Sequence, residues 1–358
     1  MERKRIGEID CLRFLFAATI LIHHFNAVFP ANLLGNGYIG VEFFFLISGF
    51  LMAQHVGRIT RSSMTSTQIA NSTWTYIIRK IGSFYPYYFL ALMLRLILFY
   101  VIIDYQGLRE IASVLLQSIP TFTLTVFGLN FGCPFLYDST FWYLSVMIIS
   151  MFILYPMILK DRDTACKLLL PIISLFLLGY LYKTYGFVSP FADWTGFCYV
   201  GILRGIAQIA LGASLSVLSD WLIHNQPRYL YSRSVFVRIC LTLVKLGCYG
   251  IVFLFAQGLP IENIHVLLFL SIGILLSFSG IGYTIPDHRI TRYLGKISLP
   301  IYIFHGLMRD AASKTLTSVM PSTSLVLVLS GASLILCVIL MYLTDTAWKR
   351  LSSLMRKI

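Results

Sequence analysis

Charged side chains are scarce in this sequence. Of its 358 residues, 12% are charged and 58% are hydrophobic, which excludes an ordinary soluble globular domain and favours a protein with many membrane spans. Acidic residues are the rarest charges, 15 against 28 Lys and Arg. The cations are spread over short loops between apolar runs and form no basic domain, so we expect no nucleic-acid binding and read them as membrane topology.

Signals for metal binding and for processing are also missing. The seven cysteines show no CxxC or comparable spacing, so we expect small core residues and no metal site. The first residues, MERKR, lead into a long apolar stretch without a small-residue cleavage site, so the first span is expected to remain as an anchor. We find no repeat or linker and predict one membrane domain over residues 1–358, without a separate soluble domain.

Eleven apolar runs have roughly the length of a span; they lie near residues 9–29, 38–55, 81–103, 111–129, 141–159, 168–186, 197–218, 239–257, 264–282, 297–317 and 324–345. If all eleven cross, Lys and Arg divide 10 inside to 14 outside. If the polar run 111–129 does not cross, they divide 20 to 4, which the positive-inside rule favours. We predict an all-α, polytopic transmembrane helical bundle with about ten crossing helices and a re-entrant or surface segment near 111–129. It would lie in the cytoplasmic membrane with both termini cytoplasmic.

The first span carries two ionisable side chains, Arg13 and His24. Eleven helical residues make about three turns, so both lie on one face, roughly 16 Å apart along the axis. Such groups are costly in a bilayer and often functional. Histidine is the usual general base, and arginine grips phosphate or carboxylate. The alternative is structural: Arg13 pairs with Asp10 and His24 is only a satisfied polar group.

The second span adds Glu42, an acid in the outer half. Its carboxylate would orient the His24 imidazole and stabilise its protonated form, or it is an interfacial group that reaches water. Ser48 and Gly49 form a small pair near mid-span. Close helix contact is the favoured interpretation, and lining of a cavity is the lesser one.

Further candidates follow along the chain. Arg79 and Lys80 end a long inner loop. The cations of this loop either serve only to keep it on the inner side of the membrane or bind an anionic cytosolic ligand. Trp142 opens a span as an ordinary interfacial aromatic would. Tyr302 and His305 lie in the tenth span, about a third of the way from the inside. There the second imidazole makes a hydrogen bond between helices or takes part in catalysis.

These pieces, in this order, resemble acyltransferase family 3 of integral membrane proteins. The resemblance rests on the spacing of Arg13 and His24, FFFLISGF at 43–50, the basic loop ending at Pro86, WYLS at 142–145, and GKIS with YIFH at 295–298 and 302–305. Each motif alone is weak, but the ordered set spans almost the whole chain.

The resemblance implies O-acetylation, or related acylation, of an extracytoplasmic glycan, with a cytosolic acyl-CoA as co-substrate and no bound cofactor. His24 matches the essential histidine of the family, Arg13 its partner arginine, and Arg79 with Lys80 part of the donor loop. Two positions depart from the family: Ser83 replaces an arginine and Met147 replaces a glutamate.

In the expected reaction the phosphates of CoA meet the basic inner surface and Arg13. His24, aided by Glu42, deprotonates a sugar hydroxyl, or carries the acyl group itself. Asp10, Ser48, Trp142, Tyr302 and His305 would line the site. A transporter or flippase of a glycan or lipid intermediate is the alternative, and a structural subunit of glycan-assembly machinery is a third interpretation.

Overall fold

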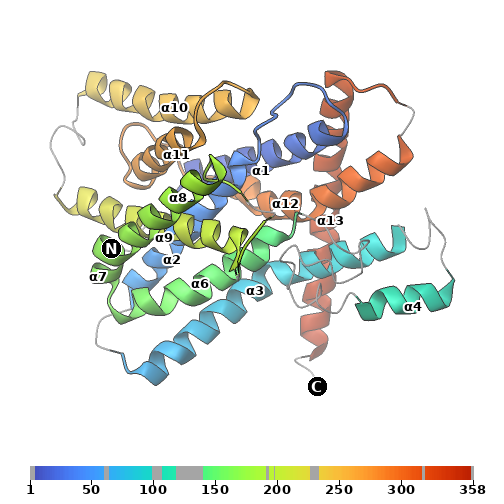
Figure 1. Ribbon diagram of the computed structural model, residues 1–358, viewed down its shortest axis with the longest axis horizontal. Coiled ribbons are helices and arrows are strands. Elements are labelled where there is room, and N and C mark those ends of the chain that lie inside the picture. Colours follow the sequence, from blue (N-terminus) through green and yellow to red (C-terminus); the bar gives the residue numbers. More distant parts are fainter. Residues whose placement is uncertain are drawn as a thin grey trace.

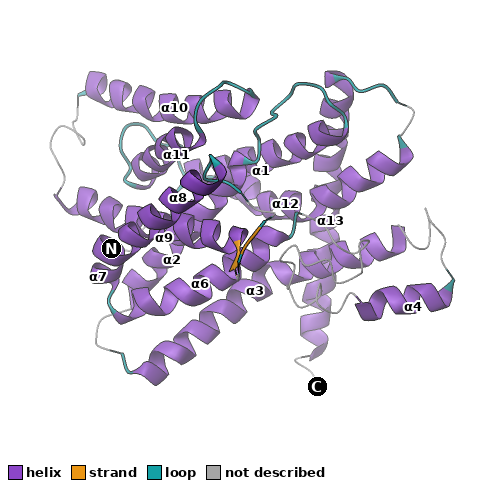
Figure 2. Ribbon diagram, in the orientation of Figure 1, coloured by secondary structure: helices purple, strands orange, loops and turns teal. Residues whose placement is uncertain are grey.

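The computed structural model describes residues 5–59, 64–98, 107–117, 140–190, 193–196, 198–225, 234–316 and 319–355. Helices dominate these residues (Figures 1 and 2), as the all-α prediction requires. They are α1 (Gly7–Val28), α2 (Ile39–Ile59), α3 (Ser66–Leu96), α4 (Leu108–Gln117), α6 (Trp142–Lys160), α7 (Arg162–Thr164), the π-helical turn η2 (Ala165–Leu169), α8 (Leu170–Tyr185), α9 (Val200–Asn225), α10 (Val235–Gln257), α11 (Asn263–Phe278), α12 (Arg289–Thr315) and α13 (Thr323–Met355). A two-stranded antiparallel pair, β1 (Trp194–Thr195) and β2 (Cys198–Tyr199), precedes α9.

Several helices are long and apolar enough to cross a bilayer. Within the described residues seven satisfy both criteria: Gly7–Val28, Ile39–Ile59, Trp142–Lys160, Arg162–Tyr185, Val200–Asn225, Val235–Gln257 and Thr323–Ser353. The helix α11 is apolar but shorter, and α3 and α12 carry charged residues along their length. Large apolar side chains such as Phe176 and Phe236 point outward, as lipid contact requires. The count of ten crossing helices stays a prediction.

The first helix lies between α2 and α12. Its start meets the start of α12, where a Cβ on Gly295 would come within 2.1 Å of the Asp10 carboxylate. Further along, His24 of α1 lies beside His305 of α12, so these two helices run parallel. Glycines also allow α2 to approach α1: a Cβ on Gly40 would lie 2.8 Å from the Phe16 carbonyl oxygen.

Glycines also permit a close contact between α2 and α9. A Cβ on Gly49 would lie 1.9 Å from the Ile209 carbonyl oxygen, and one on Gly212 would lie 2.0 Å from that of Leu46. Only hydrogen fits at these positions. Gly49 therefore provides the close helix contact that the sequence predicted, whereas Ser48 faces Met147 of α6.

The bundle has two distinct ends. At one end α1 and α12 begin and α2 stops; we call it the basic end because Arg5, Arg13, Arg58, Arg79 and Lys80 line cavities there. The helices α3 and α6 are antiparallel: Tyr76 stacks on Tyr155 near the basic end, and Tyr88 packs on Phe141 towards the opposite end.

Because α3 ends where α6 begins, the chain between them leaves and returns at one end of the bundle. This agrees with a run near 111–129 that does not cross. The helix α4 covers its first residues and lies at the periphery (Figure 1). Residues 118–139 lie outside the described residues.

Candidate functional site

Two histidines from distant parts of the sequence meet in the bundle. The ring centroids of His24 and His305 are 4.9 Å apart, and His305 is 1% exposed. Its Nδ1 lies 2.6 Å from the Tyr302 carbonyl oxygen of its own helix. The helix α12 begins at Arg289, eight residues before the apolar run near residue 297, and the depth of His305 in the membrane stays a prediction. His305 is therefore almost as far along α12 as His24 is along α1, and the parallel packing brings them level.

A row of side chains connects this pair to Arg13. Tyr143 lies close enough to Arg13 for an electrostatic interaction and contacts Ser48. Its ring centroid is 5.3 Å from that of Tyr302, which is 5.5 Å from that of His305. The predicted stripe therefore exists, but it runs through α6 and α12 as well as α1. Tyr143 was missed as a site residue, although it follows Trp142 in a quoted motif.

Met147 occupies a central position beside this row. Its sulfur accepts hydrogen bonds of 3.5 Å from both Ser48 Oγ and Tyr143 Oη. A soft acceptor thus stands where the family resemblance led us to look for a carboxylate. No acid–base role falls to this position in the present chain.

One cavity at the basic end is lined by the start of α1 and the last turns of α2. Its volume is about 420 Å³, and Arg5, Asp10, Arg13, Gln54 and Arg58 line it. Asp10 binds Arg5 at 2.5 Å and lies 3.7 Å from Arg13, so the expected Arg13–Asp10 pair is the weaker of the two. Three arginines against one carboxylate make this cavity positive.

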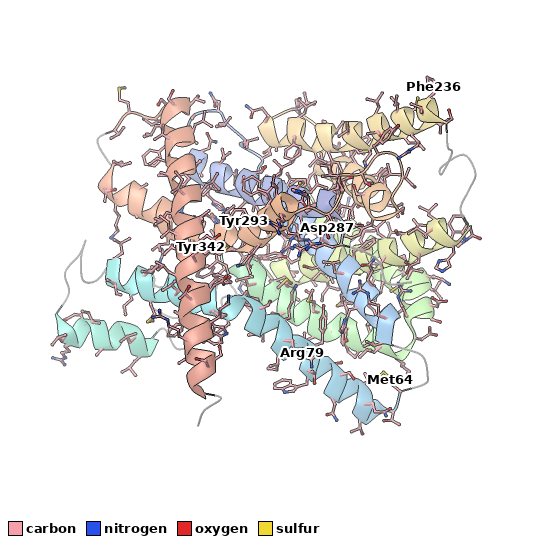
Figure 3. All side chains as sticks on the ribbon, turned by 180° about the vertical axis from the view of Figure 1, so that it is seen from behind. Met64, Arg79, Phe236, Asp287, Tyr293 and Tyr342 are labelled. Atoms are coloured by element: carbon pink, nitrogen blue, oxygen red, sulfur yellow. The ribbon has the colours of Figure 1, made fainter. Side chains whose placement is uncertain are left out.

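The second cavity contains the predicted donor residues. It has a volume of about 530 Å³ and is lined by Arg79 and Lys80 together with His55, Tyr76 and Tyr155. Tyr76 stacks on Tyr155 with centroids 4.1 Å apart and planes 8° from parallel, and His55 lies 5.3 Å from Tyr76. Figure 3 shows Arg79 on the half of α3 nearer Met64. Cations beside aromatic faces suit a nucleotide.

The two cavities are close neighbours. Lys80 is near enough to Arg13 for the two charges to repel, and the adjacent residues Gln54 and His55 of α2 line one cavity each. The three aromatic residues of the second cavity were not predicted. The available signal was their spacing, since Tyr76, Arg79 and Lys80 share one face of a helix.

Glu42 has a different partner from the expected one. It is fully buried, and its carboxylate accepts hydrogen bonds from Arg204, at 2.6 Å, and from Ser189. The reason is the helix period: Gly40 faces α1, and two residues further on the side chain has turned about 200°, towards α9. Glu42 therefore binds Arg204 and Ser189, and it does not orient His24 as predicted.

Trp142 belongs to the same buried cluster. Its ring lies 5.1 Å from the Arg204 guanidinium carbon, and it is only 6% exposed. It is not an interfacial belt residue but a cation–π partner. Trp142 and Glu42 thus hold Arg204, at the opposite end of the bundle from the two cavities.

Three cations that the sequence places deep inside spans pair with a carboxylate of another helix. Besides the Glu42–Arg204 pair, Lys245 binds Glu8 at 2.8 Å, and Arg95 binds Asp310. The sequence showed the cations but not their partners, because each pair joins helices far apart in the chain.

Comparison with known proteins completes the description of the site. A family model described as an acyltransferase domain matches residues 6–342, nearly the whole chain. No curated protein and no solved structure matches the sequence significantly.

Proposed function

The chain belongs to acyltransferase family 3, and we propose that this membrane enzyme moves an acetyl group from cytosolic acetyl-CoA to a hydroxyl of a cell-surface glycan or its lipid-linked unit. Acyl transfer needs a site for the donor, a base for the acceptor hydroxyl and a path between them. The observation that carries the proposal is the row from the cationic cavities through Tyr143 and Tyr302 to the His24–His305 pair.

The basic end supports a donor with phosphates and an aromatic base. In the proposal the nucleotide of acetyl-CoA occupies the cavity of Arg79, Lys80 and Tyr76, and Arg13 receives the adjoining part of the donor. Guanidinium and ammonium groups bind phosphate through charge-assisted hydrogen bonds. The thioester arm then extends along the row towards His24.

His24 is the proposed general base. It accepts the proton of the sugar hydroxyl as the hydroxyl oxygen attacks the thioester carbonyl carbon. The carbon–sulfur bond breaks, and the CoA thiolate leaves and receives that proton. In a stepwise variant of the reaction, the imidazole carries the acetyl group between the two substrates. His305, Tyr302 and Ser48 line the path, and Glu42 has no proton-transfer role because Arg204 and Ser189 occupy its oxygens.

The two ends of the bundle support the matching orientation. Because CoA is cytosolic and cannot cross, we place the basic end, with both termini, at the cytoplasmic face of the cytoplasmic membrane. The acceptor then enters from the opposite end, next to any glycan-assembly machinery of the cell envelope.

Labelled acetyl-CoA tests the proposal. Membranes that contain the protein should place label on an external glycan, and His24→Ala should lower that labelling at least about 100-fold, the usual contribution of a general base. Insertion of the variant is checked by its yield in the membrane fraction.

His265→Ala is the matched control, since this histidine is exposed on α11 and lies 4.0 Å from the equally exposed Glu262; its labelling should stay near that of the wild type. Normal labelling by His24→Ala would remove His24 from the mechanism, and unlabelled glycan with the wild type would remove the proposed reaction.

A further inference from the structure

Arg309 lies one helical turn beyond His305 on α12, away from the donor cavities. Four residues advance about 6 Å along a helix and return to nearly the same face. The His305 ring lies beside His24, with centroids 4.9 Å apart, so Arg309 is about one helical turn beyond the His24–His305 pair. A cation therefore stands next to the point where the acceptor hydroxyl must lose its proton.

The contacts of Arg309 do not join two parts of the fold. Its Nε and Nη2 bond to Oδ1 of Asp310, at 2.6 Å and 2.5 Å, and Asp310 is the next residue of the same helix. The bridge between helices is made by Arg95 of α3, which binds the other carboxylate oxygen of Asp310. Arg95 and Arg309 thus contact the same carboxylate from two different helices.

One edge of the guanidinium is left for a ligand. Within the residues that the structure describes, Nη1 of Arg309 makes no hydrogen bond to the protein, and the side chain is 14% exposed. A mostly buried arginine in a membrane protein is costly and often functional. Its planar fork suits a carboxylate or a phosphate oxygen.

We propose that the acceptor carries an anionic group, on the sugar that is acylated or on its neighbour, and that Arg309 binds this group. The inference rests on the proposed function and specifies its acceptor class. The anion holds the sugar so that its hydroxyl faces His24. The two sources of such a group are the carboxylate of an acidic sugar and the phosphate of a linkage.

Chemically altered acceptors test this proposal. Surface glycan is isolated from cells that lack the protein, and half of it has its carboxylates reduced to alcohols. With wild-type protein and labelled acetyl-CoA, we expect the KM for the glycan to rise about 10- to 100-fold on reduction if a carboxylate is the anchor. If phosphate is the anchor, reduction of the carboxylates leaves the KM unchanged, and removal of phosphate with cold hydrofluoric acid raises the KM by this factor. Equal acceptance of all three preparations would overturn the inference.

Three variants place the effect on Arg309. Arg309→Gln should raise the KM for untreated glycan by the same factor and leave the KM for acetyl-CoA unchanged, and Arg309→Lys should restore part of the loss. Asp310→Asn removes the competing acid, so it should lower the KM for the glycan; an equal rise in both Arg309→Gln and Asp310→Asn would assign Arg309 a structural role. No glycan labelling by the wild type would defeat the proposed function instead.

Discussion

At the scale of single residues, the buried charges explain why certain positions are ionic in so apolar a chain. Arg204 and Glu42 have side chains that are 2% and 0% exposed, and Ser189 and Trp142 supply further contacts. A buried pair repays the loss of hydration only while both partners are present. The Glu42–Arg204 pair fixes which face of α2 packs on α9, so that the opposite face of α2 packs on α1.

Glu42→Gln should therefore lower the free energy of unfolding by about 3–5 kcal/mol, because it leaves Arg204 charged and unpaired. The double variant Glu42→Leu with Arg204→Met should recover most of this loss. Thermal unfolding in detergent measures both. Lys167→Gln, which breaks the exposed Lys167–Asp163 pair, is the control and should change stability by less than about 1 kcal/mol. A loss below about 1 kcal/mol for Glu42→Gln would contradict this account.

At the scale of elements, α3 shows how one helix builds a binding surface. The residues that it contributes to the proposed donor cavity recur at helical spacing: Asn71, Ser72, Thr75, Tyr76, Arg79, Lys80 and Ser83. Such a stripe gathers hydroxyls, one aromatic ring and two cations on one face. The facing rings, His55 and Tyr155, come from α2 and α6 and complete the cavity.

Arg79→Gln combined with Lys80→Gln should raise the KM for acetyl-CoA about tenfold or more, since each side chain is expected to lose a charge-assisted bond to phosphate. The KM for acetyl-pantetheine, which lacks the nucleotide, should hardly change. Lys183→Gln, at an exposed position of α8, controls for net charge. Equal effects on both donors would show that this cavity does not bind the nucleotide.

At the scale of the whole molecule, the arrangement of ends decides which substrate meets which residues. Helices α1, α2, α3 and α12 place most of their basic residues at one end. The Arg162 side chain also caps that end by donating hydrogen bonds to the Ala53 carbonyl oxygen and to Asp220. Because the end of α3 and the start of α6 lie together at the opposite end, the helices after α6 continue to alternate in direction between the two ends. The distribution of cations then agrees with the positive-inside rule.

A topology reporter fused after Asp163 should be cytoplasmic, and one fused after Gly258 should be external, because α8, α9 and α10 separate these sites by three crossings. Paired alkaline phosphatase and fluorescent protein fusions measure both positions. An external reporter after Asp163 would reverse the bundle in the membrane and with it the sides of donor and acceptor.

The sequence by itself determined the all-helical class, the apolar runs, the family resemblance and the common face of Arg13 and His24. These follow from hydropathy and from the fixed period of the helix, which depend on residues close in the chain. Only the tertiary structure decided that His305 stands level with His24, that Tyr143 joins them to Arg13, and that Glu42 belongs to Arg204. Which side chains become neighbours depends on contacts between helices that are far apart in sequence. Glycines such as Gly49 and Gly295 allow one particular helix to pack closely, and the start of each helix sets how far along it a residue lies. No local sequence pattern encodes these contacts.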